Sequence, residues 1–155
     1  MKNTTTTIFI VLIFSLSSIA QTIKSDKGIY LDQNNIPYTG IYNEYYENGE
    51  IRVEINLKNG VQDGLTNIYF ENGIKNEQRA YKNGKMHGTW ITWNELEVKL
   101  AEVNYKLGNK DGKWLIWDEN GILRYEMKYH KGNKIGTWKI YDSKGNLVNQ
   151  KNYLK

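Results

Sequence analysis

The chain has no cysteine, one proline and two histidines among its 155 residues. Without cysteine it can form no disulfide and no thiolate metal site, and it offers no cysteine for lipid attachment. One proline and an aromatic content of 13% argue against a disordered chain. The folded protein must therefore be held together by the packing of its own side chains.

Long apolar runs are also missing, and the one apolar stretch of note lies near the start. Residues 8–16 are apolar, a lysine precedes them, and the small residues Ser18 and Ala20 follow. A charged start, an apolar core too short to span a bilayer and small residues at −3 and −1 are typical of a signal peptide. We expect residues 1–20 to be a signal peptide and the protein to be exported, to the periplasm or the extracellular space. An uncleaved anchor is the alternative.

Charge of one sign does not dominate either. The net charge is +4, which suits a protein that meets anionic surfaces but does not indicate a nucleic-acid binder. We therefore expect no nucleic-acid partner.

Glycine, in contrast, recurs at a fixed spacing of 24 residues, in three series. In the second series Glu97 replaces the one missing glycine. Self-similarity at a period in the twenties indicates a repeat architecture. The three series are Gly40, Gly64, Gly88, Gly112 and Gly136; Gly49, Gly73, Gly121 and Gly145; and Gly60, Gly84, Gly108 and Gly132.

Each unit reads as one β-hairpin. In the fourth unit Tyr125, Met127 and Tyr129 alternate with polar residues, which is the period of a strand with one face buried. An Asn-Gly pair at the first turn is a strong hairpin signal, because both residues accept positive φ. We predict an all-β fold: an elongated, twisted, single antiparallel sheet of tandem 24-residue hairpins. The predicted segments are a lead-in at 21–39, whose strand begins the sheet, and units at 40–63, 64–87, 88–111, 112–135 and 136–155.

Two units depart from the pattern. The third lacks the turn glycine in "NELE" at 94–97, so we expect a wider or bulged loop there. In the second, Glu77 and Arg79 occupy positions that are apolar elsewhere, which predicts a locally wetter patch.

Stacking the units aligns most of the aromatic residues in three columns. Such rings bury a large area each, and no helix pattern is available to cover them. We therefore expect the sheet to bury its apolar face by twisting and curling on itself. The columns are Tyr42, Thr66, Trp90, Trp114 and Trp138; Tyr45, Tyr69, Trp93, Trp117 and Tyr141; and Leu57, Tyr81, Tyr105, Tyr129 and Tyr153.

The segments "GTWITW", "GKWLIWDENG" and "YKNGKMHG" resemble the bacterial variant of the MORN repeat. The resemblance covers residues 36–155. It extends to proteins labelled toxin–antitoxin YwqK-family antitoxins, which are built of such repeats. MORN-like proteins are generally scaffolds that bind partner proteins or phospholipid membranes, so the resemblance implies a binding role.

Nothing in the sequence points to catalysis, a metal or a cofactor. After residue 20 the only serines are Ser25 and Ser143, both in turn-like sequence. His87 and His130 fall at different positions of the repeat, so no nucleophile and base are set to converge. No zinc-type spacing occurs. We predict a protein that is not an enzyme, and we expect either histidine to be a turn or edge residue.

One polar column runs along the units, with one member in each: Glu54, Gln78, Glu102, Glu126 and Gln150. We expect it to line the solvated face, where its acids pair with Arg52, Arg124 and Lys128 on neighbouring strands. Cation or sugar binding is the alternative.

Charge also separates between the two rows of turns. The tip edge, formed by the turns within hairpins, carries eight acids against Lys144: Glu47, Glu50, Glu71, Glu95, Glu97, Asp118, Glu119 and Asp142. The joint edge, formed by the turns between hairpins, carries seven lysines against Asp63 and Asp111: Lys58, Lys82, Lys85, Lys106, Lys110, Lys131 and Lys134. These lysines are the candidate surface for an anionic partner; solubility and edge protection are the alternative.

Three hypotheses for function follow. The preferred one is an exported scaffold that binds a partner protein through its sheet surface. The second is a peripheral binder of phospholipid headgroups through the joint edge, and the third is a carbohydrate-binding surface made from exposed aromatic residues. An antitoxin-like inhibitor is implied by the resemblance alone.

Overall fold

The protein is described here by a computed structural model that covers residues 23–26 and 28–153. The expected signal peptide lies outside the described residues. Within them all regular structure is β, which confirms the expected fold class. Over the same residues no helix is long and apolar enough to cross a membrane.

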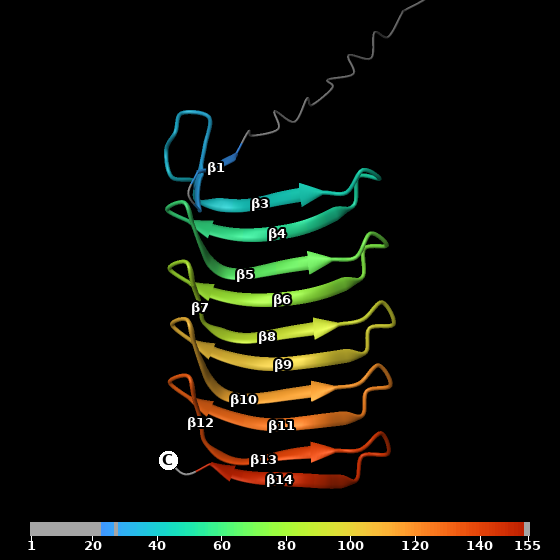
Figure 1. Cartoon of the computed structure of the whole chain (residues 1–155). Coiled ribbons are helices and arrows are strands. Elements are labelled where there is room, and N and C mark those ends of the chain that lie inside the picture. The colour runs from blue at the N-terminus through green and yellow to red at the C-terminus, as the bar shows by residue number, and fades with distance from the viewer. Residues whose placement is uncertain (1–22, 27, 154–155) are drawn as a thin grey trace, which may run out of the picture.

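Twelve strands form one open antiparallel sheet, in which five hairpins stack in chain order (Figure 1). Two short strands lie off the main path: β7 (Lys85–Met86) pairs with β6, and β12 (Asn133–Lys134) pairs with β11. The main path contains β3 (Gly40–Tyr45), β4 (Ile51–Lys58), β5 (Val61–Tyr69), β6 (Lys75–Lys82), β8 (Gly88–Trp93), β9 (Lys99–Lys106), β10 (Asn109–Trp117), β11 (Leu123–His130), β13 (Gly136–Tyr141) and β14 (Leu147–Tyr153).

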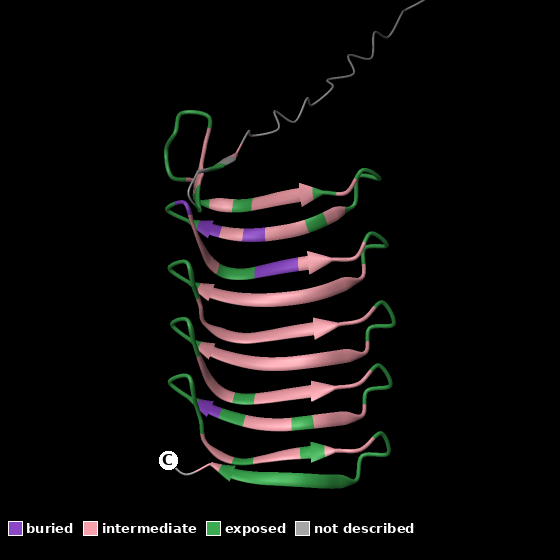
Figure 2. Cartoon of the chain, in the orientation of Figure 1, coloured by how far each residue is buried: buried purple, intermediate pink, exposed green. Residues whose placement is uncertain are grey.

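The sheet is one layer thick, and most strand residues are half-buried (Figure 2). The buried apolar side chains of the described residues are Ile55, Leu57 and Tyr129. The expectation that the sheet curls on itself to bury one face was therefore wrong. Side chains are covered by their neighbours on adjacent strands instead, which is how cross-strand pairs stabilise a sheet.

The sheet has two different faces. Trp114 lies beside Val103 on β9 and Met127 on β11, and this face, which we call the aromatic face, also carries Trp90 and Trp138. The neighbouring residue Leu115 lies between Glu102 and Glu126 on the opposite side, which we call the polar face. The alternation that predicted strands thus separates aromatic from polar side chains.

The tip turns were assigned wrongly in part. At the tips only the residue at the glycine position has positive φ, as in Gly49 (φ 89°), so these are longer turns. In the first of them Asn48 Oδ1 accepts the N–H of Glu50. At the joints both residues have positive φ, as in Asn59 (51°) and Gly60 (77°), which fits a two-residue type I′ turn. An Asn-Gly pair occurs at both edges, so the dipeptide alone does not separate the two turns.

The third tip turn is not widened, contrary to expectation. The N–H of Glu97 donates to the carbonyl of Asn94 at 3.0 Å, just as the N–H of Gly49 donates to Tyr46 at 3.0 Å. Glu97 achieves this by adopting φ 58°. The turn keeps its shape because Asn94 Oδ1 accepts the N–H groups of Leu96 and Val98.

Glu97→Gly is expected to raise the free energy of unfolding by about 0.5–1 kcal/mol. Relief of a left-handed residue is worth about 1–2 kcal/mol, and the greater freedom of glycine in the unfolded chain offsets part of that. The matched control is Glu95→Gly in the same turn, where φ is not positive and a loss is expected. Urea unfolding of the two variants measures both changes; a loss in Glu97→Gly would contradict the assignment.

The lead-in does not supply a strand of the large sheet. Instead β1 (Lys24–Asp26) and β2 (Ile29–Leu31) form a separate two-stranded sheet. The lead-in crosses the first joint turn: Tyr30 N–H donates to Gly60 O, and Gly60 N–H donates to Tyr38 O, each at 2.8 Å. Tyr30 also stacks on Tyr42 at 5.4 Å, so the lead-in covers part of the first hairpin without lengthening the sheet.

Candidate binding surfaces

Seven rings form a continuous stack along the aromatic face. Neighbouring ring centroids lie 4.9–5.4 Å apart and the planes are inclined by 48–65°, which are favourable aromatic geometries. Tyrosines and tryptophans alternate because each hairpin ends on a tyrosine and the next begins with a tryptophan. Two of the predicted columns are thus merged into one stack: Tyr81, Trp90, Tyr105, Trp114, Tyr129, Trp138 and Tyr153.

The tryptophans of this stack are also hydrogen-bonded to the preceding hairpin. Trp90 Nε1–H donates to Ala80 O at 2.9 Å, and Trp114 Nε1–H donates to Asn104 O at 3.0 Å. Trp138 makes the same bond to Lys128 O at 3.1 Å. Because an indole N–H needs a partner when it leaves water, these bonds fix each ring against its neighbour. Burial also raises the pKa of the Tyr105 and Tyr129 hydroxyls.

Two of the seven joint-edge lysines belong to this stack. Lys110 Nζ lies 4.2 Å from the centroid of Trp114, and Lys134 Nζ lies 4.5 Å from that of Trp138. These are cation–π distances. The ammonium groups therefore lie over the rings of the aromatic face and do not line up with the other lysines.

The second unit carries an ion pair within the aromatic face. Arg79 Nη2 lies 2.6 Å from Glu77 Oε2, and the Arg79 guanidinium lies 5.3 Å from the Trp90 ring. Both side chains are about one-third exposed or less, at 33% and 28%. The expected wetter patch is thus a half-buried ion pair covered by an aromatic ring.

Trp93 and Trp117, the remaining tryptophans, lie on the polar face. Lys99 connects Trp117 to the polar column, because its Nζ lies 5.6 Å from the Trp117 ring and 2.8 Å from Glu102 Oε2. Each face of the sheet therefore carries its own aromatic residues.

The polar column lies on the polar face, where Ile91 and Leu115 interrupt it, and its predicted partners were wrong. Glu126 pairs with Lys139 at 3.2 Å and accepts the Tyr141 hydroxyl, while Glu54 accepts from Asn67 at 2.9 Å. The arginines go elsewhere: Arg52 pairs with Glu44, and Arg124 pairs with Asp118 at 3.4 Å. The cause is the shift in strand pairing at the end of each hairpin, which moves the arginines off the column.

The joint turns are held by side chains whose role the sequence did not reveal. The carboxylate of Asp63 accepts the N–H of Asn83 at 2.9 Å, and that of Asp111 accepts the N–H of Lys131 at 3.0 Å. Thr39 and His87 occupy the same repeat position and accept the equivalent N–H groups, each 20 residues further on: Asn59 at 2.9 Å and Leu107 at 3.4 Å. The 24-residue spacing of these four acceptor side chains was the signal in the sequence that could have revealed this role.

The hydrogen bond from Lys131 N–H also affects the pKa of the Asp111 carboxyl. The backbone N–H of Lys131, with the nearby His130 and Lys106, lowers the pKa of Asp111 below its usual value. His130 Nδ1 lies 3.2 Å from the same carboxylate. Both histidines lie on the joint edge, as expected: His130 is the last residue of β11, and His87 lies between β7 and β8.

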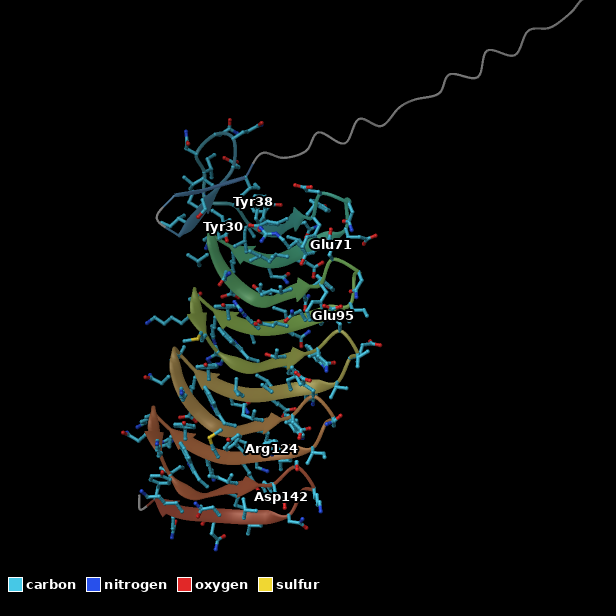
Figure 3. All side chains as sticks on the ribbon, turned by 45° about the vertical axis from the view of Figure 1, so that its right-hand side comes forward. Tyr30, Tyr38, Glu71, Glu95, Arg124 and Asp142 are labelled. Carbon is cyan, nitrogen blue, oxygen red and sulfur yellow. The ribbon has the colours of Figure 1, made fainter. Side chains whose placement is uncertain are left out.

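Five joint-edge lysines remain exposed and make no ion pair with any described residue: Lys58, Lys82, Lys85, Lys106 and Lys131. The acidic residues of the tip edge also divide into two groups. Asp118 and Asp142 accept backbone N–H groups of their own turns, whereas the tip glutamates stay exposed. Figure 3 shows Glu71 and Glu95 on this edge. The described residues hold no cluster of three or more His, Asp or Glu arranged for a metal ion.

The MORN repeat variant model matches the chain three times, at residues 38–59, 110–131 and 134–155. These segments fall on the first, fourth and fifth stacked hairpins, which are therefore MORN repeats. No curated protein matches the chain.

Proposed function

We propose that the protein is an exported, non-catalytic repeat scaffold that binds a partner protein through the aromatic face. The observation that carries this proposal is the open sheet: apart from the buried Tyr129, the rings of the stack are only half-buried, and no second layer covers them among the described residues. Large apolar surfaces left open on a soluble chain commonly serve as interaction sites.

The C-terminal end of this face is the favoured contact region. Tyr125 and Ile140 are 42% and 36% exposed, and they line a shallow, mainly apolar hollow with Met127, Trp138 and Tyr153. Protein interfaces are enriched in Tyr, Trp and Met. Export is part of the proposal and rests on the pattern of residues 1–20 alone. An antitoxin role would be one case of such partner binding.

Site-specific crosslinking tests which face contacts the partner. A photoreactive phenylalanine is placed at Tyr125, on the aromatic face, or at Lys128, an exposed residue three positions along the same strand and thus on the opposite face. In the native envelope fraction we expect Tyr125 to give one discrete crosslinked protein and Lys128 to give none.

Tyr125→Lys is the confirming variant. It should reduce capture of the same protein through a second photoreactive site, at Ile140, at least about tenfold while the sheet remains folded, because a charge would enter an apolar contact. Equal crosslinking from both faces, or none from Tyr125, would refute the assignment of the aromatic face.

A further inference from the structure

Two straight columns of opposite charge run along the two edges of the sheet. On the tip edge each of the first four hairpins presents an exposed glutamate at the same repeat position: Glu47, Glu71, Glu95 and Glu119. Figure 3 shows two of these, Glu71 and Glu95, above one another at successive tips. On the joint edge the matching column has an exposed lysine on each of the first three hairpins, Lys58, Lys82 and Lys106, and His130 occupies the fourth position, where it lies 3.2 Å from Asp111 Oδ2.

The two columns have the same period. Successive members are 24 residues apart in both. Each hairpin adds two strands at 4.7–4.9 Å, so both columns repeat at about 9–10 Å. Figure 1 shows the tips and the joints of the five hairpins in two nearly straight rows, so the two edges run parallel to one another.

The opposite charges cannot neutralise one another within one molecule. A strand of six to nine residues separates the two edges by about 20–30 Å, well beyond the Debye length of about 8 Å at physiological salt. The members of the two columns that are Glu or Lys make no ion pair with a described residue. Each edge is therefore open to a partner of opposite charge.

We propose that copies of this chain associate side by side, with the tip edge of one against the joint edge of the next. A second copy fits this edge because the two columns repeat at the same interval. When Glu71 of one copy lies opposite Lys82 of the next, Glu47 lies opposite Lys58 and Glu95 lies opposite Lys106. The contact is heterologous, so it leaves a free edge on each outer molecule and can propagate.

Each pair is weak, because exposed ion pairs contribute little singly. The edge is also narrow, so the contact is smaller than a standard protein interface. Association therefore rises with protein concentration and falls steeply with salt. The surface differs from the aromatic face, so the two contacts can form together.

Complementary charge reversal tests the pairing in the full-length mature protein. The joint-edge variant is Lys82→Glu with Lys106→Glu, and the tip-edge variant is Glu71→Lys with Glu95→Lys. The charge-matched control is Lys113→Glu with Lys128→Glu, which are exposed residues of the polar face and face each other across β10 and β11. Sedimentation is measured at about 0.02 M and about 0.5 M salt, with circular dichroism to verify folding.

The wild-type protein and the control should associate at low salt and dissociate at high salt. Each edge variant alone should associate at least about tenfold more weakly, and an equimolar mixture of the two should regain association, since one then has two acidic edges and the other two basic edges. A wild type that stays monomeric at low salt, a mixture that does not associate, or a control as impaired as the joint-edge variant would overturn the proposal. A monomeric wild type that binds anionic phospholipid vesicles would assign the lysines to a membrane instead.

Discussion

Trp114→Ala is expected to lower the free energy of unfolding by about 3–5 kcal/mol, the range for removing a large aromatic side chain from a packed site. The ring lies between Tyr105 and Tyr129, at 5.3 and 5.2 Å, so its loss interrupts the stack at the centre of the fourth hairpin. It also leaves the carbonyl of Asn104 without its indole donor. A domain of this size has only about 5–15 kcal/mol of stability to lose.

Trp117→Ala is the matched control, because this tryptophan belongs to the same strand but lies on the polar face outside the stack. Its replacement should cost clearly less. Trp114→Phe keeps an aromatic ring but removes the N–H donor, so it distinguishes the two contributions. It should lower the free energy of unfolding by about 1–2 kcal/mol for the lost donor. Urea unfolding followed by circular dichroism measures all three. Equal losses at Trp114 and Trp117 would show that the stack has no special role.

Gly112→Ala is expected to destabilise the protein by about 2–3 kcal/mol, the cost of a strained backbone residue. Gly112 has φ 103°, which side chains rarely adopt, and an added Cβ would lie 3.1 Å from Asn104 Cβ. Asn104 cannot easily move away, because its Nδ2 donates to the carbonyl of Lys113 at 2.8 Å.

Gly136→Ala is the matched control at the same position of the next repeat. There φ is 63° and an added Cβ meets nothing within 4 Å, so a loss of only about 1 kcal/mol is expected. Thermal or urea unfolding separates the two variants. If Gly136→Ala costs as much as Gly112→Ala, the close approach to Asn104 does not matter.

The spacing of glycines and the period-two alternation were sufficient to predict the stacked hairpins, because both depend on backbone geometry repeated at a fixed interval. The same signals could not distinguish the two kinds of turn, since Asn59-Gly60 and Asn48-Gly49 are the same dipeptide in different strand pairings. They also could not show that Glu97 would accept positive φ to preserve its turn.

The surfaces were less predictable than the sheet, because a side chain can reach across strands. Lys110 and Lys58 both belong to the joint edge in sequence, yet Lys110 bends over the Trp114 ring and Lys58 stays exposed. Likewise, Asp111 was counted among the exposed charges of the joint edge, but its carboxylate accepts the N–H of Lys131 in the next joint turn. The repeat pattern contains no signal for the identity of a partner. The proposed binding role therefore rests on the open aromatic face.

Small-angle X-ray scattering of the purified protein at high salt tests the single-layer sheet most directly. Ten stacked strands predict a length of about 45–50 Å and a thickness of one sheet, about 10 Å. A compact particle about twice as thick, as in a two-layer sandwich, would contradict the open aromatic face on which the binding proposal depends.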